Sequence, residues 1–171
     1  MTVPPKFSLQ QFDIKLLISQ FDFSNFDCSH EEEDLGLNEF IHNEALEYQQ
    51  DCMGSTYVFF HQGIPLGFVT IAMYAIEVKE TKLRIVASEK RYPALLLGRL
   101  GTDNNYRDLH VGLSMVQWTV ARAQELAKEI GCRFVVVLTR QSKVGFYNKC
   151  GFEVCPNYNN KKKVLMNFQI A

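Results

Sequence analysis

A long amphipathic helix between two strand-like segments is the feature that most limits how this chain can fold. Residues 112–130 place apolar side chains at steps of three and four, which is typical of one helix face, and Gly131 is a natural helix end. The apolar stripe consists of Leu113, Val116, Val120, Ala123, Ala127 and Ile130. Residues 92–102 and 132–139 on either side indicate strands, and the second run is almost entirely apolar, as in a sheet covered on both faces. The chain is therefore predicted to fold as a sheet with helices packed against it.

A second helix is predicted nearer the N-terminus. Ser29 followed by Glu32 forms a capping-box pattern, so this helix is expected to begin near His30 and to run to about Gln50. The acidic residues of its first turn suit the positive end of a helix dipole. Gly54 follows as the expected stop.

The remaining segments predict two hairpins and a short helix. Ser55–His61 and residues 66–77 are β-branched and aromatic runs around a tight turn, which is typical of two antiparallel strands. A short helix is expected over residues 142–149. Residues 152–155 and 163–170 predict a final hairpin.

The order of these elements predicts an α/β (α+β) fold with a mixed central sheet and helices on its faces. The 171 residues are the length of one ordinary domain, and no repeat or Ser/Gly-rich linker marks a boundary, so residues 1–171 are expected to form a single domain. No apolar run approaches the roughly 18 residues that span a bilayer. The N-terminal residues have no secretion signal, so a cytoplasmic protein is expected.

Charge is divided unevenly along the chain. Residues 1–54 contain 11 Asp or Glu against Lys6 and Lys15, whereas residues 55–171 contain 16 Lys or Arg against 8 Asp or Glu. An acidic surface attracts cations, and a basic surface attracts phosphates. Solvated helix faces are the simpler interpretation of the acidic half, so charge by itself does not identify a ligand.

The cysteines and histidines give no metal-binding pattern. The cysteines are Cys28, Cys52, Cys132, Cys150 and Cys155. Their spacing is irregular and contains no CxxC pair, so free thiols are expected. His30, His42 and His61 lie far apart without metal-ligand spacing, and no metal is expected.

The turn between the third strand and the long helix is the strongest candidate site. A helix start presents free N–H groups and a positive dipole end, so a turn there can hold a phosphate. The chain has neither the Gly-Lys-Ser/Thr of a Walker loop nor GxGxxG, which disfavours a nucleotide triphosphatase and a dinucleotide-binding protein. The residues of the turn are Arg107, Asp108, Leu109, His110, Val111 and Gly112.

These six residues resemble the acyl-CoA pyrophosphate loop of the GCN5-related N-acetyltransferases (GNAT), whose pattern is Arg/Gln-x-x-Gly-x-Gly/Ala. Residues 145–152, with the sequence GFYNKCGF, resemble the FYxxxGF segment of that family at its usual distance downstream. The resemblance extends across nearly the whole chain, through residues 26–28, 57–58 and 93–100. These three segments resemble the branch that contains the acetyltransferase toxins of bacterial toxin–antitoxin pairs.

The resemblance implies a mostly antiparallel sheet with helices on both faces and an acetyl-CoA-dependent N-acetyltransferase. Such an enzyme transfers the acetyl group directly to a primary amine in a ternary complex. Candidate acceptors are aminoacyl-tRNA, which the basic half favours, and a small amine or peptide, which the acidic half favours. An antitoxin and a second copy of the chain in a homodimer are the candidate protein partners, and no membrane is involved.

The resemblance also assigns roles to residues. The backbone N–H groups of Leu100, Gly101 and Thr102 are expected to hold the pantetheine and face the thioester carbonyl. The six turn residues are expected to bind the pyrophosphate. Tyr147 is the candidate general acid for the departing thiolate, and the simpler interpretation is a packed core aromatic.

The general base is left open by the sequence. Acetyl transfer requires a neutral amine, so a proton acceptor or a water chain is needed. The candidate side chains are Glu89, Asp103 and His110. Asp103 is equally a candidate cap for the turn.

His110 departs from the family pattern, because it stands where the loop has its first glycine. A residue with a Cβ tolerates positive φ poorly. If the loop needs positive φ there, CoA affinity would fall, whereas at negative φ the N–H still donates normally. This departure supports an alternative function, a non-catalytic CoA-binding regulatory module with a degenerate pyrophosphate loop.

Overall fold

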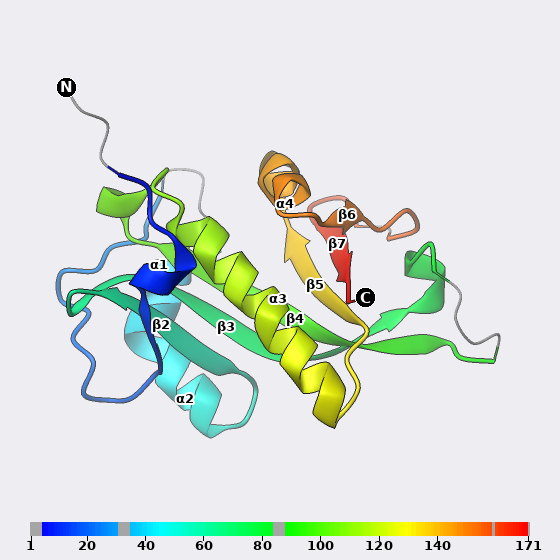
Figure 1. Cartoon of the computed structure of the whole chain (residues 1–171), viewed down its shortest axis with the longest axis horizontal. Helices are drawn as coiled ribbons and strands as arrows, with labels where there is room; N and C mark the ends of the chain where they lie inside the picture. The colour runs from blue at the N-terminus through cyan, green and yellow to red at the C-terminus, as the bar shows by residue number, and fades with distance from the viewer. Residues whose placement is uncertain (1–4, 31–34, 84–87, 159, 171) are drawn as a thin grey trace. The chain divides into compact units, whose positions relative to one another are not determined.

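Seven strands form the sheet of this computed structural model, which describes residues 5–30, 35–83, 88–158 and 160–170 (Figure 1). The strands are β1 (Asp13–Leu16), β2 (Ser55–His61), β3 (Ile64–Glu77), β4 (Arg91–Thr102), β5 (Phe134–Thr139), β6 (Glu153–Val154) and β7 (Val164–Gln169). Hydrogen-bonded neighbours follow the order β1-β2-β3-β4-β5-β7-β6. β4 and β5 are parallel, while β1/β2, β2/β3, β5/β7 and β6/β7 are antiparallel. The predicted mixed, mostly antiparallel sheet is confirmed.

The helical segments are α1 (Leu37–Glu39), the π-helical turn η2 (Phe40–Glu44), α2 (Ala45–Gln50), α3 (Val111–Glu129) and α4 (Val144–Lys149). Short 3-10 turns are η1 (Leu9–Gln11), η3 (Val78–Glu80), η4 (Asn104–Tyr106) and η5 (Gln141–Lys143). The long helix predicted over residues 112–130 is confirmed as α3. Its predicted stripe is wrong at the C-terminal end, because Ile130 is 61% exposed.

Contacts divide the chain into two compact units. The first contains Met1–Ile71 and Arg99–Trp118, and the second contains Ala72–Gly98 and Thr119–Ala171. The first unit has 13 Asp or Glu against 4 Lys or Arg, whereas the second has 6 Asp or Glu against 14 Lys or Arg. The uneven charge of the sequence therefore coincides with the two units.

In the first unit, different helices cover the two faces of β2. Val58 is fully buried in a cluster that includes Phe40 of η2. Tyr57 and Phe59 point to the opposite face, because side chains alternate along a strand. Their rings contact Trp118 of α3, with centroids 4.6 Å and 5.8 Å from the indole. Helices on both faces, as predicted, are thus found in this unit.

The first helix begins later than the sequence predicts. Gly36, with φ of 62°, precedes α1, so the helix begins at Leu37 rather than near His30. Ser29 does not cap it, because the Ser29 N–H and hydroxyl donate to the Asp27 carboxylate at 2.9 Å and 2.5 Å. A Ser or Asp side chain commonly bonds to neighbouring backbone in this way outside helices.

The end of this helix agrees better with the prediction, because α2 ends at Gln50. Gly54 does not end it with a left-handed backbone. A Cβ at position 54 would lie 2.9 Å from the carbonyl oxygen of Ile71, so glycine is needed there for close approach of the chain to β3. Glu32, the other half of the predicted capping box, lies outside the described residues.

The predicted hairpin of β2 and β3 is confirmed. Gln62 and Gly63 join the strands with φ values of 49° and 78°, the two-residue turn that matches the twist of a hairpin. β1, which pairs with β2, is not predicted by the sequence. It is an edge strand in which Asp13 and Lys15 alternate with Ile14 and Leu16, and four residues are too few for this alternation to stand out in the sequence.

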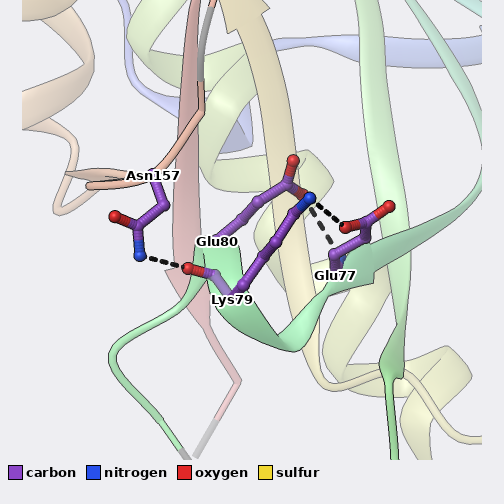
Figure 2. A network of polar contacts seen from close by, with 4 residues as sticks. All are labelled: Glu77, Lys79, Glu80 and Asn157. Atoms are coloured by element: carbon purple, nitrogen blue, oxygen red, sulfur yellow. Dashed lines mark hydrogen bonds and ion pairs between the residues drawn. The ribbon is translucent and has the colours of Figure 1, made fainter.

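In the second unit, a polar network fastens η3 to the segment before β7 (Figure 2). Asn157 Nδ2 donates to the Lys79 carbonyl at 2.6 Å, and Lys79 Nζ pairs with Glu77 at 2.9 Å. The Glu77 N–H donates to the Glu80 carboxylate at 3.2 Å. The predicted strand, short helix and final hairpin correspond to β5, α4 and the β6/β7 pair.

All five cysteines are free thiols. Within the ranges given above, no group of three or more His, Cys, Asp or Glu side chains is arranged to hold a metal ion. No helix of the described chain combines the length and apolar character needed to cross a membrane.

Candidate functional site

The residues predicted for ligand binding, from Leu100 to Gly112, all lie in the first unit. β4 ends at Thr102, η4 and a turn follow, and α3 begins at Val111. His110, the last residue of the turn, is exposed. A strand end, a turn and a helix start are therefore continuous in sequence within one unit.

The first turn of α3 offers backbone donors. The N–H of Ser114 donates to the carbonyl of His110 at 3.0 Å. This is the first hydrogen bond of the helix, so the N–H groups of the three preceding residues have no acceptor within it. These residues are Val111, Gly112 and Leu113. With the positive dipole end of a 19-residue helix, these donors suit a phosphate group.

Asp103 holds the start of the turn through both carboxylate oxygens. Its side chain is buried, with 2% of the residue exposed. Oδ2 accepts from the N–H of Asp27, and Oδ1 accepts from the N–H of Asn105, both at 2.9 Å. The carboxylate therefore acts as a cap, one of the two roles that the sequence left open.

Arg107 braces the turn from the other side. Its Nε donates to Asn104 Oδ1 at 3.0 Å, and its Nη2 donates to the Cys28 carbonyl at 3.3 Å. The N-terminal segment adds a further contact, because the N–H of Phe7 donates to the carbonyl of Leu109 at 2.8 Å. The turn is thus fixed by segments far away in the sequence.

Two residues of the turn have left-handed backbones. Asp108 has φ of 62° and His110 has φ of 66°. Glycine adopts this region freely, whereas a residue with a Cβ pays about 1–2 kcal/mol. His110 therefore adopts the positive φ that a glycine would adopt without strain. A glycine occupies this position in the acyl-CoA loop that the sequence resembles.

The end of β4 is packed too tightly for a larger residue at position 101. A Cβ on Gly101 would lie 2.5 Å from the Phe68 ring and 3.2 Å from the Cys28 sulfur. A Cβ on Gly67 would lie 3.0 Å from the Gly101 carbonyl oxygen. Close packing holds this backbone in place, which is a requirement for a strand that positions a ligand.

Tyr147, the predicted acid, belongs to α4 in the second unit. It is 6% exposed, and its ring contacts Phe146 and Phe152 with centroids 5.0 Å and 5.6 Å away. Burial, and to a smaller extent the nearby Cys150, raises the pKa of its phenol above the ordinary value. The hydroxyl is therefore protonated at neutral pH.

The candidate bases are divided between the units. Asp103 and His110 lie in the first unit, and Glu89, which is exposed, lies in the second with Tyr147. Both oxygens of Asp103 already accept backbone hydrogen bonds. That engagement disfavours Asp103 as a proton acceptor.

Arg99 is a further residue of interest that the sequence did not reveal. Its guanidinium carbon lies 3.9 Å from the ring centroid of Phe40 and 4.9 Å from that of Tyr48. Phe40 and Tyr48 lie 59 and 51 positions before Arg99, so no local pattern connects the three residues and only the folded chain brings them together.

Comparison with known proteins bears on the fold. No protein-family model matches the chain, and no curated protein matches its sequence. The structure of AtaT complexed with acetyl-methionyl-tRNAfMet matches with a TM-score of 0.79 at 18% identity, over 92% of this chain and 94% of that chain.

Two further solved structures have the same fold. A tyrosine-to-phenylalanine mutant of KacT has a TM-score of 0.79 at 18% identity, over 94% of this chain and 95% of that chain. AtaTR bound with AcCoA has a TM-score of 0.74 at 19% identity, over 94% of each chain. These matches confirm the fold predicted from the resemblance to toxin-type acetyltransferases.

Proposed function

We propose that this protein is an acetyl-CoA-dependent N-acetyltransferase that transfers an acetyl group directly to a primary amine in a ternary complex. The observation that carries the proposal is the set of backbone donors at Val111, Gly112 and Leu113, at the start of α3 and after the end of β4. Three adjacent N–H groups at a long helix start fit the pyrophosphate of CoA. We assign the turn residues to that group.

In the proposed reaction, the neutral amine attacks the thioester carbonyl, the C–N bond forms and the C–S bond breaks. Backbone N–H groups of Leu100, Gly101 and Thr102 are assigned to hold the pantetheine and face the carbonyl. The thiolate takes a proton from a general acid, and the proton lost by the amine passes to water or to a base. No metal takes part in this scheme.

We assign the general acid to Tyr147. Its raised pKa keeps the phenol protonated, so it has a proton to donate throughout the neutral range. Structures of tyrosine-to-phenylalanine mutants have been determined for AtaT and for KacT. They support the assignment of a role to a tyrosine in proteins of this fold. Residues 1–171 are proposed to form a single N-acetyltransferase domain.

We propose the amino group of an aminoacyl-tRNA as the acceptor. AtaT has been solved in complex with acetyl-methionyl-tRNAfMet. The second unit of this chain carries 14 Lys or Arg against 6 Asp or Glu, as a phosphate backbone requires. Lys143 and Lys149 on either side of Tyr147 are exposed, and neither forms an ion pair within the described chain. A small amine or a peptide is the competing acceptor.

An antitoxin is the proposed protein partner, because one AtaT structure contains the C-terminus of the antitoxin AtaR and another match is a KacTA–DNA complex. Under this proposal the protein acts as a toxin in the cytoplasm, and the second copy of a homodimer is a further partner. Strong induction in a bacterial host should arrest growth. Healthy growth under strong induction would contradict the toxin role.

A non-catalytic CoA-binding regulatory module is the second candidate function, and the left-handed backbone of His110 favours it. Substituting His110→Gly separates the two functions. A large rise in CoA affinity would support a degenerate loop. Unchanged CoA affinity together with measurable turnover would rule out the degenerate loop. A rise of about 1 kcal/mol in the free energy of unfolding would verify that the substitution relieves backbone strain at position 110.

Release of the CoA thiol tests the enzyme directly. Purified protein is incubated with acetyl-CoA and, in separate reactions, with polyamines, peptides and charged tRNA. Release that depends on charged tRNA is the expected result. Thiol release with a small amine instead would identify that amine as the acceptor. No release with any amine would contradict the proposed acetyltransferase activity.

A further inference from the structure

The guanidinium carbon of Arg99 lies over two aromatic rings, 3.9 Å from the centroid of Phe40 and 4.9 Å from that of Tyr48. Phe40 lies in the π-helical turn η2 and Tyr48 lies in α2, and all three residues belong to the first unit. A guanidinium that contacts two rings is less free to rotate, and its N–H groups keep the fixed planar geometry of the group. The ring contacts therefore restrict the orientation of the Arg99 N–H groups before a ligand binds.

No carboxylate neutralises this cation within residues 5–30, 35–83, 88–158 and 160–170. The first unit has 13 Asp or Glu against 4 Lys or Arg, so an unpaired arginine is unexpected there. Lys15 is paired with Asp13, and Arg107 donates to neutral acceptors. The N–H groups of Arg99 thus have no protein anion to bind in the described chain.

Arg99 also lies next to the strand end that is assigned to the thioester. Side chains alternate along a strand, so Arg99 shares a face with Gly101, about 6.6 Å along β4. A Cβ on Gly101 would meet Phe68, which belongs to the same buried cluster as Phe40. The free donors are therefore on the face of β4 that α1, η2 and α2 cover.

We propose that Arg99 binds a phosphodiester oxyanion near the 3′ end of an RNA that carries the acceptor amine. The inference rests on the proposed function and adds a binding residue to it. A guanidinium offers two parallel N–H groups that match two oxygens of a phosphate or a carboxylate. An RNA acceptor has a phosphodiester beside the terminal ribose, whereas a polyamine has no anion and is repelled by Arg99.

The test is a thermodynamic cycle between Arg99 and one phosphate. A short RNA hairpin ending in CCA is made with either the natural phosphodiester or an uncharged methylphosphonate at its 3′-terminal linkage. Fluorescence anisotropy at one fixed salt concentration measures binding of both RNAs to the wild type and to Arg99→Gln. Lys15→Gln, which removes the same charge from the same unit, is the matched control.

Arg99→Gln is expected to weaken binding of the natural RNA about tenfold or more, because a charge-assisted hydrogen bond is lost. The methylphosphonate should weaken binding to the wild type equally, and the two changes together should add little more. Lys15→Gln should change affinity less than twofold. If Arg99→Gln does not fold, Arg99→Lys, which keeps the charge without the planar fork, should give an intermediate loss.

Additive effects, an unchanged affinity of Arg99→Gln, or a wild type that does not bind the RNA would overturn the proposal. Binding of a dipeptide carboxylate that depends on Arg99, without RNA binding, would also overturn it. The cycle requires no acetyl transfer. An inactive wild type would therefore contradict the proposed enzyme while the role of Arg99 is still decided by binding.

Discussion

Arg107 donates a hydrogen bond of 3.3 Å from Nη2 to the carbonyl of Cys28, which lies 79 positions earlier in the chain. Asn104 accepts from the Nε of the same guanidinium at 3.0 Å. The side chain thus ties the turn to the segment that precedes the first helix. The hydrogen bonds of Arg107 stabilise the turn. The backbone N–H groups at the start of α3 can therefore bind the ligand.

Arg107→Ala is expected to weaken acetyl-CoA binding about five- to tenfold, because two hydrogen bonds that order the turn are lost, each contributing about 0.5–1.5 kcal/mol. Asn104→Ala removes one of the two bonds and should give part of that loss. Calorimetry on the purified variants measures the affinity. Wild-type affinity in both variants would show that the brace does not order the phosphate site.

Asp108→Asn is expected to tighten acetyl-CoA binding about two- to fivefold. The exposed carboxylate lies in the turn assigned to the pyrophosphate and repels it, while asparagine keeps the size and tolerates the φ of 62°. The gain should shrink as salt is raised. Asp51→Asn, at an exposed position after α2, is the control, and an equal gain there would assign the effect to net charge alone.

The sequence predicted those parts of the fold whose signals are local. The apolar period of α3 and the Gln-Gly turn of the β2/β3 hairpin depend on neighbouring residues, and both were found. The start of the first helix was predicted wrongly, because Ser29 bonds to Asp27 and thereby uses the side chain that a cap requires. β1 was missed because its polar–apolar alternation covers only four residues, and only the pairing with β2 identifies it as a strand.

The sequence predicted which segment forms the candidate site but not the backbone conformation or the side-chain contacts within it. The strand–turn–helix order and the departure at His110 could be seen in the sequence. The sign of φ at His110 could not, because either sign was compatible with the residues. The stacking of Arg99 on Phe40 and Tyr48 depends on the packing of η2 and α2 against β4, which no local pattern encodes.

Tyr147→Phe is expected to keep acetyl-CoA affinity and to lower the rate of transfer about 100-fold or more, the usual contribution of a general acid. The ring still fills the space against Phe146 and Phe152. Tyr92→Phe is the matched control, because Tyr92 is 5% exposed and stacks on Phe134. Equal rates for Tyr147→Phe and the wild type would remove Tyr147 from the mechanism.

Alkaline pH is expected to destabilise the fold through buried thiols. Burial raises the pKa of Cys150 to about 11 and the pKa of Cys155 to about 11, whereas an unfolded thiol ionises near 8.5. The unfolded chain therefore loses protons that the folded chain keeps. The contribution of these two thiols to the free energy of unfolding should be complete below about pH 8 and should be lost as the pH rises from about 8.5 toward 11.

Urea denaturation at several pH values checks this dependence. Cys150→Ala should reduce the alkaline fall in the free energy of unfolding, while Cys52→Ala, at an exposed thiol, should leave it unchanged. A fall of the same size in Cys150→Ala as in the wild type would show that other groups cause the alkaline loss.

Calorimetric titration of CoA-free protein with acetyl-CoA, followed by thiol release on addition of charged tRNA, tests directly whether the protein is an acetyl-CoA-dependent acetyltransferase. One-to-one binding in the micromolar range and release that requires both substrates are expected. Absence of acetyl-CoA binding would contradict the claim that the turn and the start of α3 form a pyrophosphate site. Binding without release for any amine would replace the enzyme with the regulatory module.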